Sequence, residues 1–276
     1  MPVSYSPVRY PGGKAKLYDY VKLLLNANDL IGETYIEPFA GGSGLALKLL
    51  MRNDVKRIII NDFDPAIYAF WYCVLNHTEE LINKFETTPI TLKEWDNQKK
   101  IYLDYPNNTV EYGFATFFLN RTNRSGVIKG GMIGGRSQDG EYTLDARFNK
   151  EDLINKILDI SERKDQIILE NMDAKEMLSS GFLKKYYKTF INFDPPYVVK
   201  GSQLYKNSFD EKDHRELYHY IKKCKRKWIV TYDICPLTTE LYKDFRHDIL
   251  DYKYSINEVK DAQEYIFFSD NLELPK

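Results

Sequence analysis

The tetrapeptide Asp194-Pro195-Pro196-Tyr197 is the part of the sequence best suited to carry chemistry. It follows an apolar run, TFINF at 189–193, that predicts a buried strand. Two consecutive prolines end a strand and fix the backbone in an extended turn. The turn holds the Asp carboxylate and a proline carbonyl as acceptors at a rigid corner, beside an aromatic ring. A purely structural turn is the alternative, but it leaves the motifs upstream unexplained.

A glycine-rich segment, EPFAGGSG at 37–44, is the second motif. It connects a predicted short strand at 34–37 to an apolar helical run, LALKLLM. A turn of this kind brings backbone N–H groups and a helix N-terminus close to a ligand. The glycine spacing differs from that of the dehydrogenases. The segment therefore favours nucleotide-type binding, with a plain tight turn as the alternative.

Asp62 stands at the end of the next predicted strand, RIIIN at 57–61, and lies 62 − 41 = 21 residues beyond Gly41. A carboxylate in this position can accept hydrogen bonds from ribose hydroxyls. The alternative is a helix N-cap ahead of Pro65, for which Asp64 is the better candidate.

The segment Arg9-Tyr10-Pro11-Gly12-Gly13-Lys14 is a fourth motif near the start of the sequence. Its glycines allow a tight turn close to a ligand, and Lys14 can reach a carboxylate. By itself the motif is equally compatible with a turn that faces solvent.

The alternation of strands and helices predicts an α/β fold with a mostly parallel sheet. Further strands are expected at 166–170, 189–193, 228–232 and 264–269, and helices at 15–31, 65–75, 150–163, 174–186 and 211–226. The middle of the chain differs: 86–111 is charged and polar, and 120–138 is glycine-rich and is expected to form hairpins or long loops. We interpret the middle as a second domain inserted into the first.

Composition sets few limits on function. The 276 residues carry a formal net charge of −1, so the overall charge does not indicate a nucleic-acid partner, although a local basic patch can serve. Three separated cysteines, Cys73, Cys224 and Cys235, suggest neither a zinc site nor disulfides. We expect no signal peptide, no membrane span and no metal, and a cytoplasmic location.

Taken together, the ordered motifs RYPGGK, EPFAGGSG, NDFD and DPPY resemble the Dam-type (D12 class, alpha group) DNA adenine-N6 methyltransferases, over nearly the whole chain. The resemblance implies a Rossmann-like methyltransferase core at 1–76 and 165–276 and an inserted, mostly helical or loop DNA-recognition domain at 77–164. It implies S-adenosylmethionine as cofactor. The expected cofactor-binding residues are Tyr10, Lys14, Glu37, Phe39, Ala40, Gly41, Gly42, Ser43, Asp62, Asp173 and Asp194. Asp173 could equally be a helix N-cap.

The expected activity is methyl transfer to adenine N6 in double-stranded DNA. Asp194 and the Pro195 carbonyl would accept hydrogen bonds from the amino group, in a turn completed by Pro196, and Tyr197 would stack on a base flipped out of the duplex. A cytosine-N4 methyltransferase and a non-catalytic DNA-binding protein on the same scaffold are the alternatives. A dinucleotide-dependent oxidoreductase would leave the DPPY motif unexplained.

The stretch 120–138 is the expected DNA-reading element, because it is basic and contains no acidic residue. A mobile surface loop with incidental charge is the alternative. A second basic run, 222–227, is better explained by the preference of cations for a helix C-terminus. We expect a monomer, with a restriction enzyme as a possible companion. The expected DNA-binding residues are Arg9, Asn120, Arg121, Asn123, Arg124, Lys129 and Arg136.

Overall fold

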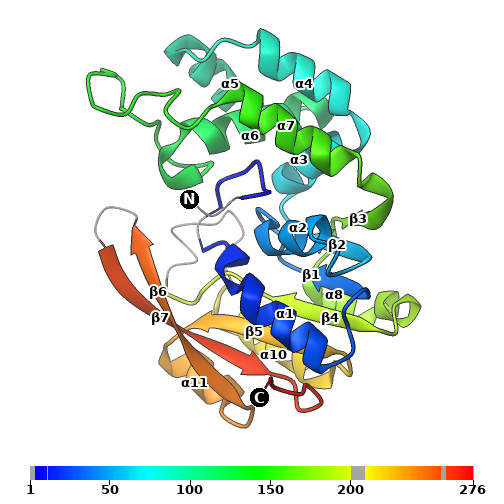
Figure 1. Cartoon of the computed structure of the whole chain (residues 1–276). Helices are drawn as coiled ribbons and strands as arrows, with labels where there is room; N and C mark the ends of the chain where they lie inside the picture. The colour runs from blue at the N-terminus through cyan, green and yellow to red at the C-terminus, as the bar shows by residue number, and fades with distance from the viewer. Residues whose placement is uncertain (1–3, 11, 108, 200–208, 256–258, 276) are drawn as a thin grey trace.

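A computed structural model of the chain describes residues 4–10, 12–107, 109–199, 209–255 and 259–275. Its centre is a seven-stranded sheet in the order β3-β2-β1-β4-β5-β7-β6 (Figure 1). The first five strands of this order are parallel, and β7 is antiparallel to both β5 and β6. The strands are β1 (Thr34–Glu37), β2 (Arg57–Asn61), β3 (Ile167–Glu170), β4 (Thr189–Phe193), β5 (Lys227–Asp233), β6 (His247–Ser255) and β7 (Val259–Phe268).

Helices cover both faces of the sheet, because its strands are apolar on both sides. Tyr35 and Phe190 pack into one core cluster with α1, α2 and α3. Ile36 and Ile191, one residue further along the same strands, pack into a second cluster with α8, α10 and α11. This alternation is the period of two that a strand imposes. The helices are α1 (Tyr18–Ala27), α2 (Gly44–Met51), α3 (Pro65–Asn76), α8 (Ala174–Ser179), α10 (Glu211–Lys223) and α11 (Pro236–Tyr242).

The chain between α3 and β3 forms a helical part that lies beyond one end of the sheet, at the top of Figure 1. α6 is its central helix and is buried on nearly every side. α6 packs closely on α3, since a Cβ on Gly113 would meet the Ala69 carbonyl oxygen at 2.7 Å. The helices of this part are α4 (Thr78–Thr87), α5 (Leu92–Asp104), α6 (Thr109–Thr122) and α7 (Lys150–Ser161).

The N-terminal segment, residues 4–10, runs between the sheet and the helical part (Figure 1). On one side the Ser6 hydroxyl donates to the Gly42 carbonyl in the loop after β1. On the other side Asn120 of α6 clamps the Arg9 backbone: its Oδ1 accepts from Arg9 N at 2.8 Å and its Nδ2 donates to Arg9 O at 2.7 Å. The segment therefore joins the two parts of the molecule.

The structure confirms the α/β fold and the mostly parallel sheet. Three predicted elements differ from the observed ones. The helix expected at 174–186 is divided, because Gly181 takes a positive φ of 84° between α8 and a 3-10 turn at Phe182–Lys185. The helix expected at 15–31 ends at Ala27 and begins with a 3-10 turn at Lys14–Leu17. The strand expected at 264–269 is the second half of a long hairpin, β6–β7.

The prediction of hairpins or loops for 120–138 is wrong at its start. Residues 120–122 form the last turn of α6, because the glycines that prevent a helix begin only at Gly126. Beyond them the chain forms a short 3-10 turn, Arg124–Gly126, and an isolated bridge between Asn123 and Met132. Among the described residues, no helix is long and apolar enough to cross a lipid bilayer.

Candidate active site

The predicted motifs meet at the carboxyl edge of the parallel strands. β1, β2 and β4 end at Glu37, Asn61 and Phe193, directly before the glycine loop, Asp62 and Asp194. β1 lies between β2 and β4, where the strand order reverses direction. Ligands of open α/β sheets bind at such a switch point.

A cavity of about 900 Å³ opens at this edge, a size within the range of ligand sites. Of the eleven predicted cofactor-binding residues, the cavity lining includes all but Gly41. It also includes Pro196 of the predicted catalytic set, and Arg9 and Arg121 of the predicted DNA-binding set. Pro195 and Tyr197 are not part of the lining. Pro11 of the first motif lies outside the described residues.

Asp194 is held from two sides through a single oxygen. Its Oδ1 lies 2.8 Å from Lys14 Nζ, in an ion pair, and accepts a hydrogen bond of 2.8 Å from the Thr231 hydroxyl of β5. Among the described residues, none donates a hydrogen bond to Oδ2. Burial raises the pKa of Asp194 above its ordinary value, and the charge of Lys14 acts in the opposite direction. The arrangement fixes the carboxylate and keeps one oxygen available as an acceptor.

Lys14 is the centre of this polar cluster. Its side chain is only 4 % exposed, and Nζ donates to the Gly12 carbonyl at 2.8 Å and to the Tyr197 hydroxyl at 2.7 Å. The Tyr197 ring packs against Tyr232, with 6.4 Å between the ring centroids. The stacking of Tyr197 on a target base stays a prediction.

The glycine loop is fixed on both sides of Gly41. Its N–H donates to Asp62 Oδ2 at 2.8 Å, and its carbonyl accepts from the buried Trp71 indole at 2.9 Å. The Tyr10 ring covers this glycine so closely that a Cβ would meet ring atoms at 2.5 to 2.8 Å. The motif around Tyr10 and the glycine loop therefore form one unit.

Asp62 has a structural task in addition to any ligand. Its Oδ1 accepts from the Asp64 N–H while Oδ2 holds Gly41. Burial raises the pKa of Asp62 to about 7, although both N–H donors oppose the shift. Asp64 caps α3 as predicted, since its Oδ1 accepts from Ala66 N. Binding of ribose by Asp62 stays a prediction.

Glu37 lies beneath the cavity. Desolvation is the largest cause that raises its pKa to about 8, so this side chain is mostly protonated at neutral pH. Its Oε1 accepts from the Tyr35 hydroxyl and from Ala46 N. Asn192 of β4 is buried beside it, and the Oδ1 of Asn192 has no hydrogen-bond partner among the described residues.

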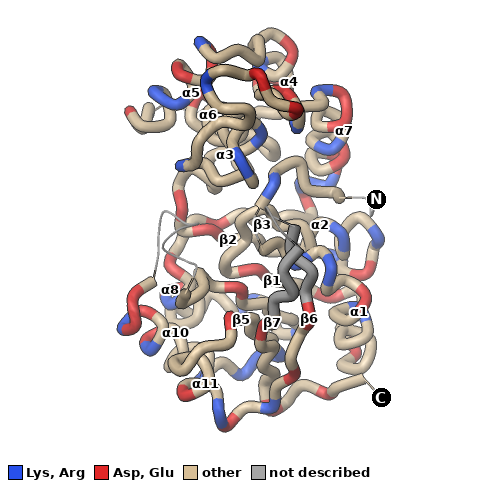
Figure 2. Tube along the Cα trace, turned by 90° about the vertical axis from the view of Figure 1, so that its left-hand side faces the viewer, with Lys and Arg blue, Asp and Glu red and all other residues tan. Residues whose placement is uncertain are grey.

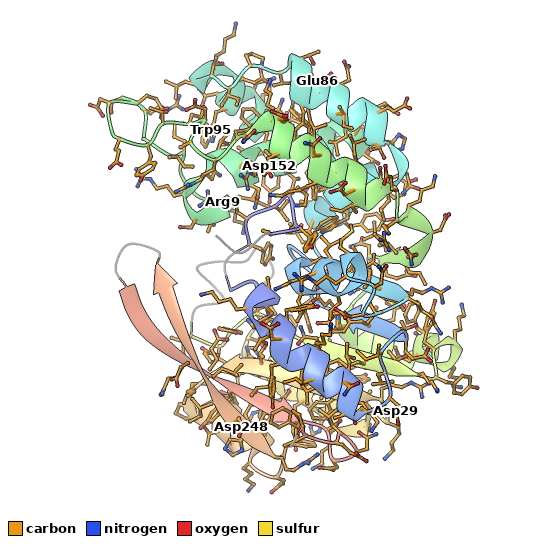
Figure 3. All side chains as sticks on the ribbon, in the orientation of Figure 1. Arg9, Asp29, Glu86, Trp95, Asp152 and Asp248 are labelled. Atoms are coloured by element: carbon orange, nitrogen blue, oxygen red, sulfur yellow. The ribbon has the colours of Figure 1, made fainter. Side chains whose placement is uncertain are left out.

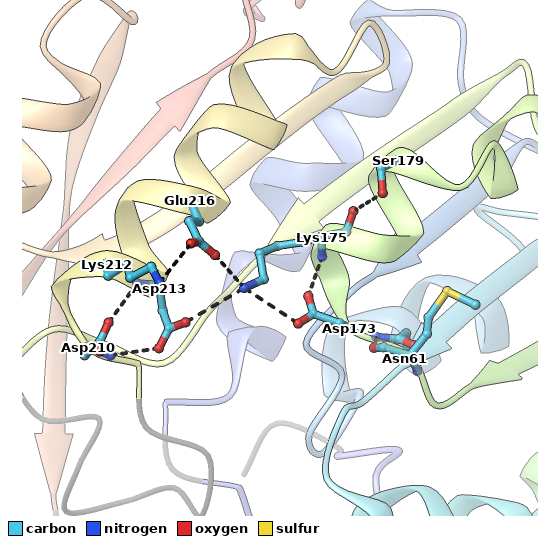
Figure 4. A network of polar contacts seen from close by, with 9 residues as sticks. Asn61, Asp173, Lys175, Ser179, Asp210, Lys212, Asp213 and Glu216 are labelled. Atoms are coloured by element: carbon cyan, nitrogen blue, oxygen red, sulfur yellow. Dashed lines mark hydrogen bonds and ion pairs between the residues drawn. The ribbon is translucent and has the colours of Figure 1, made fainter.

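At the far end of the cavity, a polar network ties α8 to α10 (Figure 4). Asp173 caps α8, with its Oδ1 accepting from Lys175 N at 2.7 Å. Lys175 Nζ lies 3.0 Å from Glu216 and 3.8 Å from both Asp173 and Asp213. The N-cap reading of Asp173 is thus confirmed, and contact with the cofactor stays a prediction.

Three guanidinium groups gather near the N-terminal segment: Arg9, Arg121 and Arg147. Among the described residues, no carboxylate forms an ion pair with any of them. Burial lowers the pKa of Arg121 to about 10, and the charges of Arg9 and Arg147 add to this effect. Figure 3 shows Arg9 where this segment meets the helical part. We call these three residues the arginine cluster, and its chemistry suits an anion.

The other predicted DNA-binding residues have different surroundings. Asn120 and Asn123 are buried and bonded within the protein; Asn123 Oδ1 accepts from the Trp95 indole at 2.7 Å. Arg136 forms an exposed double hydrogen bond with Asp96, while Arg124 and Lys129 are exposed. Burial does not favour the two asparagines as DNA contacts. Over most of the chain, basic and acidic positions are interspersed (Figure 2).

Sequence reasoning missed four residues that this geometry brings to the site: Thr231, Asp233, Glu264 and Arg147. Asp233, at the end of β5, accepts from the backbone N–H groups of Val198 and Val199 and so holds the turn after the DPPY motif. Thr231 and Asp233 share one face of β5, next to β4, which the period of two could have indicated. Among the described residues, no cluster of His, Cys, Asp or Glu could hold a metal ion.

Comparisons with known proteins agree with the motifs. The chain is 23 % identical over 244 residues to the Type II methyltransferase M.MjaIII of Methanocaldococcus jannaschii, covering 80 % of each protein. Two solved structures each align with 94 % of this chain. The rRNA methyltransferase AviRa from Streptomyces viridochromogenes is 12 % identical, with 85 % of its own chain covered and a TM-score of 0.38. Protein LPL1258 from Legionella pneumophila is 11 % identical, with 86 % of its own chain covered and a TM-score of 0.35.

The family model of the D12 class N6 adenine-specific DNA methyltransferases matches residues 10–256. This range holds all four motifs except Arg9, and it includes the helical part and every strand of the sheet except β7. The protein belongs to the D12 class N6 adenine-specific DNA methyltransferase family.

Proposed function

We propose that this adenine-specific DNA methyltransferase uses S-adenosylmethionine, acts on double-stranded DNA, and uses Asp194 to orient the adenine amino group. One observation carries the proposal: Lys14 and Thr231 hold Oδ1 of Asp194 at the cavity, while Oδ2 accepts from none of the described residues. An acceptor fixed in this way costs no reorganisation when a substrate amine arrives.

The cavity residues fit the proposed cofactor. Phe39 and the half-exposed Phe63 offer apolar rings to a flat base, and Asp62 and Asp173 offer acceptors to hydroxyl and amino groups. Oδ1 of Asn192, buried in the cavity lining without a partner among the described residues, offers a further acceptor.

Asp194 and the Pro195 carbonyl would accept the two amino hydrogens and draw the N6 lone pair out of conjugation with the ring. Bound S-adenosylmethionine would supply an electrophilic methyl group, with S-adenosylhomocysteine as the leaving group. N6 would then lose one proton, for which Asp194 Oδ2 would be the acceptor. Positioning and electrostatics carry most of the acceleration. The base would reach this edge by flipping out of the duplex.

The DNA is proposed to lie along the helical part, with 77–164 as the recognition domain between the catalytic segments 1–76 and 165–276. The arginine cluster supports this placement, because Arg9 and Arg121 line the cavity and no described carboxylate forms an ion pair with any of the three cations. Such cations bind backbone phosphates. We also propose that the protein acts as a monomer in the cytoplasm, on double-stranded DNA.

Asp194→Ala tests the proposal. We expect the methylation rate to fall by on the order of 10²-fold or more, because the oriented acceptor is lost. Binding of S-adenosylhomocysteine, measured by calorimetry, would report on the cofactor site separately. Near wild-type methylation by the variant would refute the role of Asp194.

Methylation-sensitive sequencing of DNA from cells that express the protein would identify the base, the atom and the recognition sequence together. N4-methylcytosine as the product would contradict adenine N6. The DNA recognition sequence identified in this way would also direct the search for a companion restriction enzyme.

A further inference from the structure

Glu264 is a buried carboxylate next to the cluster around Asp194, and none of the four motifs contains it. It lies on β7, opposite Asp233 of β5, and is 3 % exposed. A buried charge is costly unless an opposite charge compensates it. Glu264 Oε2 lies 3.7 Å from Lys14 Nζ, within the distance of an ion pair.

Two carboxylates therefore share one ammonium group. Lys14 Nζ is 2.8 Å from Asp194 Oδ1 and donates its other two hydrogens to Gly12 O and Tyr197 Oη. At 3.7 Å, Glu264 acts on Lys14 through charge and not through a short hydrogen bond. The Lys14 and Glu264 side chains are each 4 % exposed and the Asp194 side chain is 24 % exposed, so the dielectric screening between the three groups is weaker than in water.

We propose that Glu264 is a positioning residue for methyl transfer, whose charge competes with Asp194 for Lys14 and so keeps the Asp194 carboxylate a strong acceptor for the adenine amino group. The inference rests on the proposed role of Asp194. Without Glu264, Lys14 would neutralise Asp194 more completely. Asp194 would then attract the amino hydrogens less strongly.

Several other groups face Asp194. Glu37 and Tyr35 lie on β1, Tyr232 lies on β5, and Lys14 and Glu264 are the other titratable neighbours that interact with it among the described residues. Burial is the main cause that raises the pKa of Asp194; Lys14 lowers this pKa and Glu264 raises it. Removal of the Glu264 charge therefore lowers the pKa of Asp194, so that ionised Asp194 persists to lower pH.

The test is Glu264→Gln, assayed by single-turnover methylation of the duplex that sequencing identifies, across pH 5 to 9. We expect the rate at pH 8 to fall by about tenfold, with KM for DNA changed by less than about twofold. We also expect the acidic limb of the rate profile to move to lower pH. A purely structural role would leave that limb in place. Asp248→Asn, an exposed acid on the same hairpin, is the matched control and should match the wild type in both readouts.

Glu264→Asp gives a second measurement if the Gln variant does not fold, because it keeps the charge but moves it away from Lys14. We expect an intermediate rate and an intermediate shift of the limb. An unchanged limb, or a shift to higher pH, in a folded variant overturns the inference. Failure of the proposed function can be distinguished from failure of this inference. It would appear as an Asp194→Ala variant that still methylates DNA, regardless of the result with the Glu264 variants. Binding of S-adenosylhomocysteine should be equal in the Glu264 and Asp248 variants and the wild type.

Discussion

Gly41 is the position where the site leaves least room for a side chain. Its φ is +46°, in the left-handed region, and a Cβ would lie 2.5, 2.7 and 2.8 Å from three atoms of the Tyr10 ring. The ring cannot move freely, because the backbone N–H of Arg9, the preceding residue, is bound to Asn120. We therefore predict that Gly41→Ala perturbs both the loop and Tyr10.

Two contributions set the size of the effect. An alanine in the left-handed region costs about 1 kcal/mol or more relative to glycine, and overpacking of a tight contact costs about 1–3 kcal/mol. The free energy of unfolding should thus fall by about 2–4 kcal/mol. For a chain of this size, that corresponds to a Tm lower by roughly 4–15 °C.

The same change should weaken ligand binding more than stability alone requires, because Tyr10 lines the cavity and Gly41 shapes it. Calorimetry with S-adenosylhomocysteine, at a temperature where the variant is folded, should show a loss of affinity of at least about tenfold, equivalent to about 1.4 kcal/mol.

Gly44→Ala is the control within the same loop. A Cβ there would meet the Cβ of Ala15 at 3.5 Å, an ordinary contact, and its φ is not positive. We expect a change in stability below about 0.5 kcal/mol and a smaller loss of affinity. Equal effects of the Gly41 and Gly44 substitutions would refute the steric reasoning.

Three further predictions follow from the same region. Glu37→Gln should flatten the dependence of Tm on pH. Because the folded-state pKa of Glu37 is raised to about 8, its protonation stabilises the wild type fully below pH 4.5, and this stabilisation is lost as pH rises through 8. A wild-type-minus-variant difference that grows with pH would contradict this. Trp71→Phe should lower the free energy of unfolding by about 1–3 kcal/mol, measured by denaturant titration, because the buried Gly41 carbonyl loses its donor. Arg121→Gln should weaken DNA binding for all sequences and reduce the slope of log Kd against log salt by about 1; an unchanged slope would remove Arg121 from the phosphate contacts.

The features that the sequence predicted well depend on local backbone chemistry. Prolines that end a strand and glycines that permit a turn act within a few residues, so the DPPY corner and the loop at 37–44 stand where they were expected. Apolar and β-branched runs also predicted β2 and β4 correctly, because these strands are buried on both faces, and β1 lies at the expected residues 34–37.

Contacts between distant parts of the sequence were not predictable in this way. Glu264 was counted only as the first residue of a strand, and its contact with Lys14 spans 264 − 14 = 250 residues and depends on the pairing of β7 with β5. Asn120 and Asn123 were assigned to DNA because their neighbours in the sequence are basic. They are buried because α6 is covered on nearly every side, and composition does not show this.

The position of the helical part in the sequence has a consequence for chain entropy. β2 and β3 are neighbours in the sheet, with Ile58 opposite Ile167, so the whole helical part is a closed loop of 167 − 58 = 109 residues between paired strands. The entropy cost of such a closure grows only with the logarithm of its length, by about 0.6 kcal/mol for each doubling. A chain can therefore lengthen, shorten or exchange this segment without changing the strand register beneath the candidate site. Under the proposed role of this part, DNA recognition can then diverge while the chemistry is retained.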